Sequence, residues 1–134
     1  MKTKALFIFI VCFAAVSFSQ IKSKSKLLND KTPLKLNDIE FILIYKNIPN
    51  SSKSLRKQLD TKQCSLFITK FNDAKAVGPY KYITLYYLEV YFLKGGKRTF
   101  RVNSNHIKEN NDYTFDLGDN MLLETLWKNA MLIK

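Results

Sequence analysis

The residue pair best suited to chemistry in this sequence is Cys64 with His106, the single histidine. A thiolate beside an imidazole base is a common nucleophilic arrangement, so this pair defines one hypothesis, a small hydrolase. The residues around Cys64 have the composition of a strand and not of a helix N-terminus, which would lower the pKa of the thiol. We therefore expect Cys64 to be buried in a sheet and unreactive.

Other patterns typical of enzymes are missing from the sequence. It contains no Gly-x-Ser-x-Gly elbow and no phosphate-binding glycine loop, because Gly95 and Gly96 stand together between two strand-like segments. One histidine and two cysteines, Cys12 and Cys64, cannot build a structural zinc site. We expect a non-catalytic protein with no catalytic residue, no metal and no cofactor.

Positive charge is the feature that does stand out, with 22 basic against 11 acidic residues and a net charge of +11. The densest group surrounds the two adjacent glycines and consists of Lys94, Lys97, Arg98 and Arg101. Auxiliary basic residues occur in two further groups, Lys22, Lys24 and Lys26, and Lys53, Arg56 and Lys57. Such clusters attract anionic partners, although a biased composition would produce the same excess.

These charges must be positioned by strands and helices that the periodicity indicates. Alternating apolar residues predict strands over residues 38–46, 64–71, 81–93, 97–103 and 113–115. Gly95 and Gly96 predict a hairpin turn between the third and fourth of these strands. A short basic helix is expected from Ser51 or Ser52 to Leu59. Residues 74–80 and 106–112 are expected to be loops.

The C-terminus changes to helical spacing. Its apolar side chains recur at intervals of three and four residues, at Leu122, Leu123, Leu126, Trp127, Ala130 and Met131. Asp119 or Asn120 is expected to cap this helix. The fold class that follows is α+β, a single domain over residues 37–134. It consists of an antiparallel sheet of about five strands, with the C-terminal amphipathic helix packed on one face.

The N-terminus has the pattern of a secretory signal peptide. Lys2 and Lys4 precede an apolar run over residues 5–16, and Ser17 and Ser19 are the small residues expected before a cleavage site. We expect residues 1–19 to be removed, which places the protein in the periplasm or outside the cell. Residues 20–36 then form a basic flexible arm, in which Pro33 prevents a continuous helix.

Three functional hypotheses follow. The first is an exported binding protein whose basic hairpin engages an anionic lipid head group, an acidic polysaccharide or an acidic protein surface. The second is a protein-interaction module of the inhibitor or immunity type, which would bind through an exposed sheet edge. The third is the hydrolase using Cys64 and His106. No nucleic-acid motif is present, so no nucleic acid is expected as partner.

Overall fold

The computed structural model describes residues 31–48, 55–109 and 113–133. Within these residues the chain forms two α-helices and one antiparallel sheet of eight strands, so the α+β class is confirmed. Residues 32–134 make one compact unit with its own core. The expected signal segment, residues 1–19, lies outside the described residues, as do Lys22, Lys24, Lys26 and Lys53.

The elements follow one another as two strands, a helix, a run of five strands, a second helix and a last short strand. In chain order they are η1 (Leu36–Asp38), β1 (Ile39–Lys46), β2 (Arg56–Gln58), α2 (Thr61–Asp73), β3 (Lys75–Pro79), β4 (Tyr86–Phe92), β5 (Lys97–Val102), β6 (His106–Lys108), β7 (Tyr113–Asp116), α3 (Leu122–Asn129) and β8 (Met131–Leu132). The order of strands in the sheet is β3-β7-β6-β5-β4-β1-β2-β8. The central pairs β5–β4 and β4–β1 have the longest registers.

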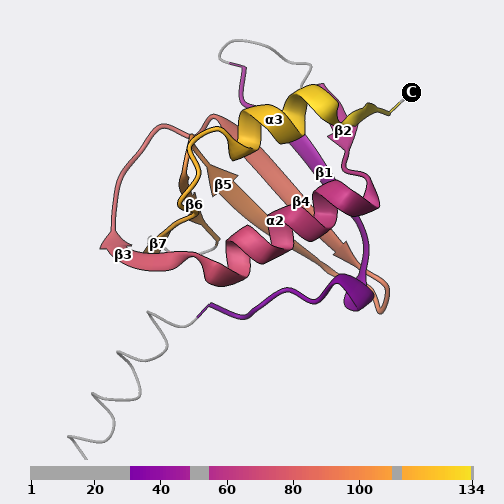
Figure 1. The fold of residues 1–134 in the computed structure, drawn as a ribbon, viewed down its shortest axis with the longest axis horizontal. Helices are drawn as coiled ribbons and strands as arrows, with labels where there is room; N and C mark the ends of the chain where they lie inside the picture. Colours follow the sequence, from indigo (N-terminus) through magenta and orange to yellow (C-terminus); the bar gives the residue numbers. More distant parts are fainter. Residues whose placement is uncertain (1–30, 49–54, 110–112, 134) are drawn as a thin grey trace, which may run out of the picture. The chain divides into compact units, whose positions relative to one another are not determined.

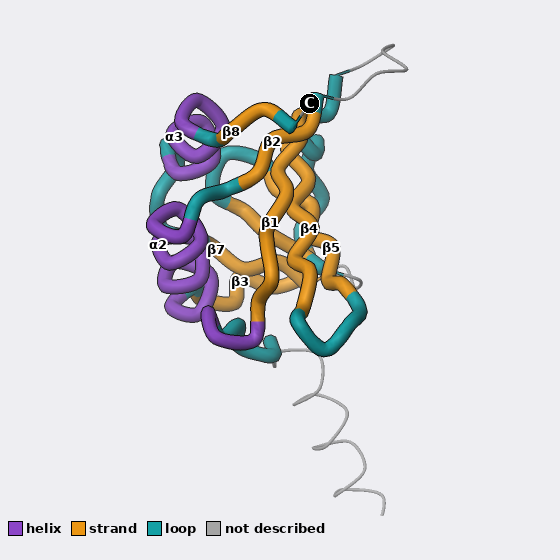
Figure 2. Tube along the Cα trace, turned by 90° about the vertical axis from the view of Figure 1, so that its right-hand side faces the viewer, coloured by secondary structure: helices purple, strands orange, loops and turns teal. Residues whose placement is uncertain are grey.

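Both helices lie on the same side of the sheet, as Figures 1 and 2 show. The core forms between them and the inner face of the sheet, where alternate residues of β1, β4 and β5 are apolar and buried. Fully buried members include Ile42, Leu88 and Phe100 from the strands and Phe67 and Leu126 from the helices. The opposite side of β1, β4 and β5, called the outer face below, is not covered by a helix in Figure 2.

The hairpin predicted at the two glycines is present between β4 and β5. Gly95 and Gly96 have φ of 92° and 83°, a left-handed backbone region that residues with a Cβ rarely adopt. The register places Tyr91 opposite Lys97 and Leu88 opposite Phe100. The strand predicted over residues 81–93 is shorter than expected, because residues 81–85 form a loop.

The strand predicted over residues 64–71 is wrong, since this segment lies in α2. Its β-branched and aromatic residues suggested a strand, but the buried positions Cys64, Phe67, Ile68 and Phe71 recur at helical intervals. Asp60 and Gln63 form a capping box at the start of the helix, with each side chain accepting from the backbone N–H of the other. The capping box and the helical period of the buried residues together favour the helix over a strand.

The short basic helix expected to end at Leu59 is also wrong in its described part, because Arg56–Gln58 is strand β2. Two segments expected as loops contain the short strands β3 and β6. They bring the sheet to eight strands instead of about five. Strands of two to five residues carry too few alternations for a periodicity to be recognised, so pairing with a neighbour decides them.

The predicted C-terminal helix is present as α3, although it ends at Asn129 and Met131 continues into β8. Met121 occupies the N-cap position and makes no side-chain capping bond. The Asp119 carboxylate instead accepts a hydrogen bond of 3.0 Å from the Met121 backbone N–H. The buried side chains Leu122, Leu123 and Leu126 face the core, as their spacing predicts.

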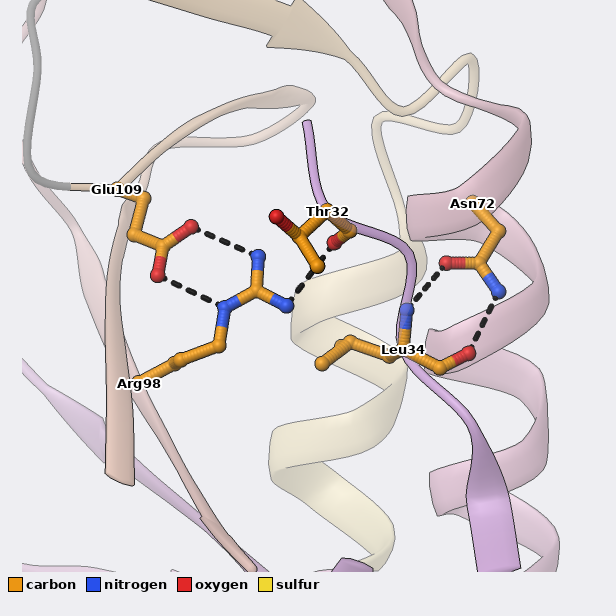
Figure 3. A network of polar contacts seen from close by, with 5 residues as sticks. All are labelled: Thr32, Leu34, Asn72, Arg98 and Glu109. Atoms are coloured by element: carbon orange, nitrogen blue, oxygen red, sulfur yellow. Dashed lines mark hydrogen bonds and ion pairs between the residues drawn. The ribbon is translucent and has the colours of Figure 1, made fainter. Parts of the chain in front are cut away.

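The folded unit begins earlier than the expected boundary at residue 37. Leu34 is only 2% exposed, and its backbone N–H and C=O both bond to the Asn72 side-chain amide, at 2.9 and 2.8 Å. Figure 3 shows this pair of bonds beside the contact of Arg98 with Thr32. The last residues of the segment expected to be a flexible arm are therefore fastened to α2 and β5.

Candidate functional site

The outer face of the sheet carries polar and aromatic side chains where the inner face carries the core. Alternation along the strands places Tyr45, Tyr87 and Arg101 on this side, while their neighbours Ile44, Leu88 and Phe100 point inward. A sheet face without a covering helix is accessible to a partner.

Four of these side chains form a line across the strands, which we call the arginine–tyrosine row. Its members are Arg56, Tyr45, Tyr87 and Arg101, each directly opposite the next in the strand register. The two tyrosine rings stack with centroids 5.4 Å apart, and the Arg56 guanidinium lies 5.7 Å from the Tyr45 ring. Three strand spacings separate the two arginines, roughly 14 Å. No carboxylate among the described residues pairs with either arginine.

A second aromatic line crosses the same strands closer to the hairpin tip. Phe41 and Tyr91 stack with centroids 4.5 Å apart, and the Lys97 ammonium lies 5.6 Å from the Tyr91 ring. Glu89 lies between the two aromatic lines and is only 7% exposed. Its carboxylate accepts hydrogen bonds of 2.9 Å from the Tyr91 hydroxyl and 2.9 Å from the Lys97 ammonium. The charge of Lys97 is therefore already neutralised within the protein.

The electrostatics of this network follow from burial and from the hydrogen bonds. Burial opposes ionisation of Glu89, but hydrogen bonds from Lys97, Tyr91 and Tyr45 outweigh it and hold the pKa of the carboxyl below its ordinary value. Burial and the nearby Glu89 carboxylate raise the pKa of Tyr45 to about 12. At neutral pH the network therefore pairs the Glu89 carboxylate with the Lys97 ammonium.

Arg98, predicted to act together with Lys97 and Arg101, lies on the inner face. Its guanidinium donates two hydrogen bonds of 2.8 Å to the Glu109 carboxylate and one of 2.9 Å to the Thr32 carbonyl oxygen (Figure 3). Its side chain is 16% exposed and lies 5.2 Å from the Phe100 ring. These contacts give Arg98 a structural role, and the structure does not bring it together with Arg101.

The remaining predicted basic residues are also dispersed. Lys94 is exposed at the hairpin turn. Lys57 points to the side of the helices, where its ammonium donates to the Trp127 carbonyl oxygen at 2.8 Å and lies 4.5 Å from the indole ring. Because a strand alternates faces, Arg56 joins the outer face and Lys57 supports the C-terminal end of α3.

The loop formed by residues 80–85, which the sequence pattern does not single out, lies against the outer face beside Arg101. The Tyr82 hydroxyl donates to the Arg101 carbonyl oxygen at 2.6 Å, and Lys108 and Thr114 donate to the Tyr80 carbonyl oxygen at 3.3 and 3.4 Å. Lys108 lies opposite Arg101 in the register and 4.6 Å from the Tyr82 ring. The loop therefore covers Lys108 and leaves Arg101 half-buried at its margin.

Tyr45 and Tyr87 are not predicted as members of a site, because aromatic residues in strand interiors are expected in the core. The alternation itself contained the signal. Tyr45 shares a face with Phe41 and Leu43, and Tyr87 shares a face with Glu89 and Tyr91. Because Glu89 is charged, its presence beside Tyr87 and Tyr91 indicates that this face of the strand is the polar one.

Cys64 and His106 do not form a pair. Cys64 lies on α2 with its Sγ 3.8 Å from the Leu59 carbonyl oxygen, and burial raises the pKa of the thiol to about 11. His106 lies on the outer face, with its ring 5.0 Å from that of Tyr80 and 6.2 Å from that of Tyr82. Among the described residues no cluster of His, Cys, Asp and Glu could hold a metal ion.

Comparison with known protein families, with curated proteins and with solved structures finds no match for this chain. Arguments about its function therefore rest on the geometry of its own residues.

Proposed function

We propose that this chain is an exported, non-catalytic binding protein whose outer face engages an anionic partner. The observation that carries the proposal is the arginine–tyrosine row. Arg56 and Arg101 lie on a face without a covering helix and have no carboxylate partner among the described residues. A guanidinium presents a planar set of donors that suits carboxylate, sulfate and phosphate groups.

This proposal moves the binding residues away from the hairpin tip. Lys97 and Arg98 form ion pairs with Glu89 and Glu109. Of the predicted hairpin cations, Arg101 remains a binding residue, and Arg56 joins it. Lys94 is available as an auxiliary contact at the tip. Export is supported by the charge and apolar pattern of residues 1–19.

The test compares two variants of equal net charge for binding to dextran sulfate, a soluble polyanion. Arg56→Gln/Arg101→Gln removes the two cations of the row, and Lys62→Gln/Lys75→Gln removes two exposed cations elsewhere on the domain. We expect the first variant to bind about tenfold more weakly than the second, because charge-assisted hydrogen bonds are lost only there. Titration calorimetry at physiological and at about threefold higher salt measures both the loss and its screening. Equal affinities for the two variants would assign the attraction to net charge alone.

A second candidate, the protein-interaction module, is favoured by the edge strand β8. Met131 and Leu132 are exposed on this edge, and neither carries a charge that would discourage strand addition. The other edge strand, β3, contains Lys75 and Pro79, which protect it. A protein partner that resists high salt and is lost in Leu132→Lys would favour this candidate over the first.

A further inference from the structure

Exposed aliphatic side chains gather at the end of the sheet where β1 finishes and β4 begins. The five members of this group, which we call the aliphatic end, are 43–81% exposed and are Ile48, Leu55, Ile83, Leu85 and Ile133. Ile83 is the most exposed of them, at 81%. Clustered exposed aliphatic groups of this kind are uncommon on monomeric soluble domains and mark contact surfaces.

Hydrogen bonds place these residues in two groups, and the pairing of β1 with β2 makes the two groups neighbours. Asn47 donates from its backbone N–H to the Leu85 carbonyl oxygen at 2.8 Å, and from its side-chain amide to the Thr84 carbonyl oxygen at 3.0 Å. Ile48 is therefore adjacent to the 83–85 segment. The Ile133 backbone N–H lies 3.4 Å from the Arg56 carbonyl oxygen, which places Ile133 next to the backbone segment of Leu55 and Arg56.

The arginine–tyrosine row borders the aliphatic end. Tyr45 is one residue from the end of β1, Tyr87 is one residue from the start of β4, and Arg101 is one residue from the end of β5. The Leu85 backbone N–H donates to the Val102 carbonyl oxygen at 2.9 Å, which joins the loop to the strand that carries Arg101. Along the strands, the surface therefore changes from the aliphatic side chains at the aliphatic end to the tyrosines and arginines of the row.

This order of groups matches the interface of a lipid bilayer. Aliphatic side chains enter the acyl boundary, tyrosine rings favour the head-group level, and arginines bind lipid phosphates. A soluble polyanion would use the arginines and leave Ile83 and Leu85 in water. Charge complementarity adds to the match, because the row carries two unpaired cations and no carboxylate.

We propose that the aliphatic end and the arginine–tyrosine row dock the domain on a membrane surface that contains anionic lipids. This inference rests on the proposed function and assigns its anionic partner to a lipid class. The domain lies on the bilayer and does not cross it. No helix in the described part of the chain is long and apolar enough to span a membrane.

The experiment measures co-sedimentation with vesicles of phosphatidylcholine, with and without about one third phosphatidylglycerol. Residues 20–134 are used, because they contain the compact unit 32–134 and exclude the apolar run over residues 5–16. Ile83→Ser is compared with Leu66→Ser, which alters an exposed leucine on α2. We expect Ile83→Ser to weaken binding to the anionic vesicles about tenfold and Leu66→Ser to leave it unchanged. Arg56→Gln/Arg101→Gln should weaken it by about tenfold or more.

A spectroscopic variant tests insertion directly. In Ile83→Trp the added indole should shift its emission to shorter wavelength when anionic vesicles are added, and should not do so with dextran sulfate. Thermal unfolding of each variant verifies that the fold is retained.

The outcomes separate the inference from the proposed function. If Ile83→Ser and Leu66→Ser sediment equally, while dextran sulfate binding still depends on Arg56 and Arg101, the membrane inference is overturned and the binding function stands. If neither ligand depends on the two arginines, both proposals fall. A change in oligomeric state in Ile83→Ser without any loss of vesicle binding would also overturn the inference, since the aliphatic end would then join two copies of the chain.

Discussion

At the scale of single residues, Glu89 organises the outer face. It is the carboxylate on which the Tyr91 hydroxyl and the Lys97 ammonium converge, at 2.9 Å each, and it lies between two stacked aromatic pairs. A buried carboxylate with such partners is stabilising only while they remain in place. Glu89 therefore links Tyr91 on β4 to Lys97 on β5, on a face of the sheet that no helix covers.

The effect of Glu89 on stability depends on pH in a defined direction. Because the fold lowers its pKa, the contribution is present above the unfolded-state value of about 4.3 and is lost as pH falls through the lower folded-state value. We expect Glu89→Gln to reduce the free energy of unfolding at pH 7 by about 1–3 kcal/mol, and by less as the pH is lowered below 4. Urea unfolding across this range measures the difference. Glu40→Gln, an exposed position on β1, serves as the control and should change stability little.

At the scale of elements, α2 shows how a local start signal competes with residue preference. Its strand-like residues Phe67, Ile68 and Phe71 pack against Leu34 and Phe100 in the core cluster. Helical spacing of these side chains and the Asp60–Gln63 capping box were both readable from the sequence. The β-branched and aromatic composition of residues 64–71 predicts a strand, but the period of the apolar residues and the cap outweigh that preference.

The cap makes a specific contribution that can be measured. We expect Asp60→Ala to lower the free energy of unfolding by about 1 kcal/mol, because the Gln63 backbone N–H at the start of α2 loses its acceptor. Asp73→Ala at the other end of the same helix should not destabilise the protein, since a carboxylate there opposes the helix dipole. Equal losses of unfolding free energy in the two variants would contradict the prediction, because they would assign the effect to the removal of one negative charge and not to the loss of the cap.

At the scale of the whole molecule, Arg98 joins three separate parts of the chain. It connects β5 with Glu109, the residue after β6, and with Thr32 at the start of the folded unit, while Asn72 of α2 holds Leu34 a few residues further on (Figure 3). Arg98 and Arg101 are only three positions apart, yet their roles differ. Arg98 holds segments of the chain together on the inner side of the sheet, whereas Arg101 lies on the outer face.

This separation predicts opposite phenotypes. Arg98→Gln should reduce the free energy of unfolding by about 2 kcal/mol, because it leaves the partly buried Glu109 carboxylate without its two charge-assisted hydrogen bonds. Its affinity for dextran sulfate at 25 °C should match that of Lys62→Gln. Arg101→Gln should retain stability and lose affinity. A loss of affinity in Arg98→Gln, measured where the variant is fully folded, would restore the hairpin cluster as the binding site.

The sequence by itself determined the features that depend on composition and local period. These are the excess of positive charge, the α+β class, β1, the glycine hairpin between β4 and β5, and the C-terminal helix. In each of them the local preferences of several consecutive residues agree, so no distant contact is needed to decide the conformation.

Only the tertiary structure decided which charges remain available to a partner. Strand register paired Lys97 with Glu89, and a contact between β5 and the residue after β6 paired Arg98 with Glu109. The pairing of β2 with β1 brought Arg56 into one row with Arg101, 45 positions away in the chain. Ion pairs and cross-strand neighbours depend on distances between residues remote in sequence, and chain folding alone sets those distances.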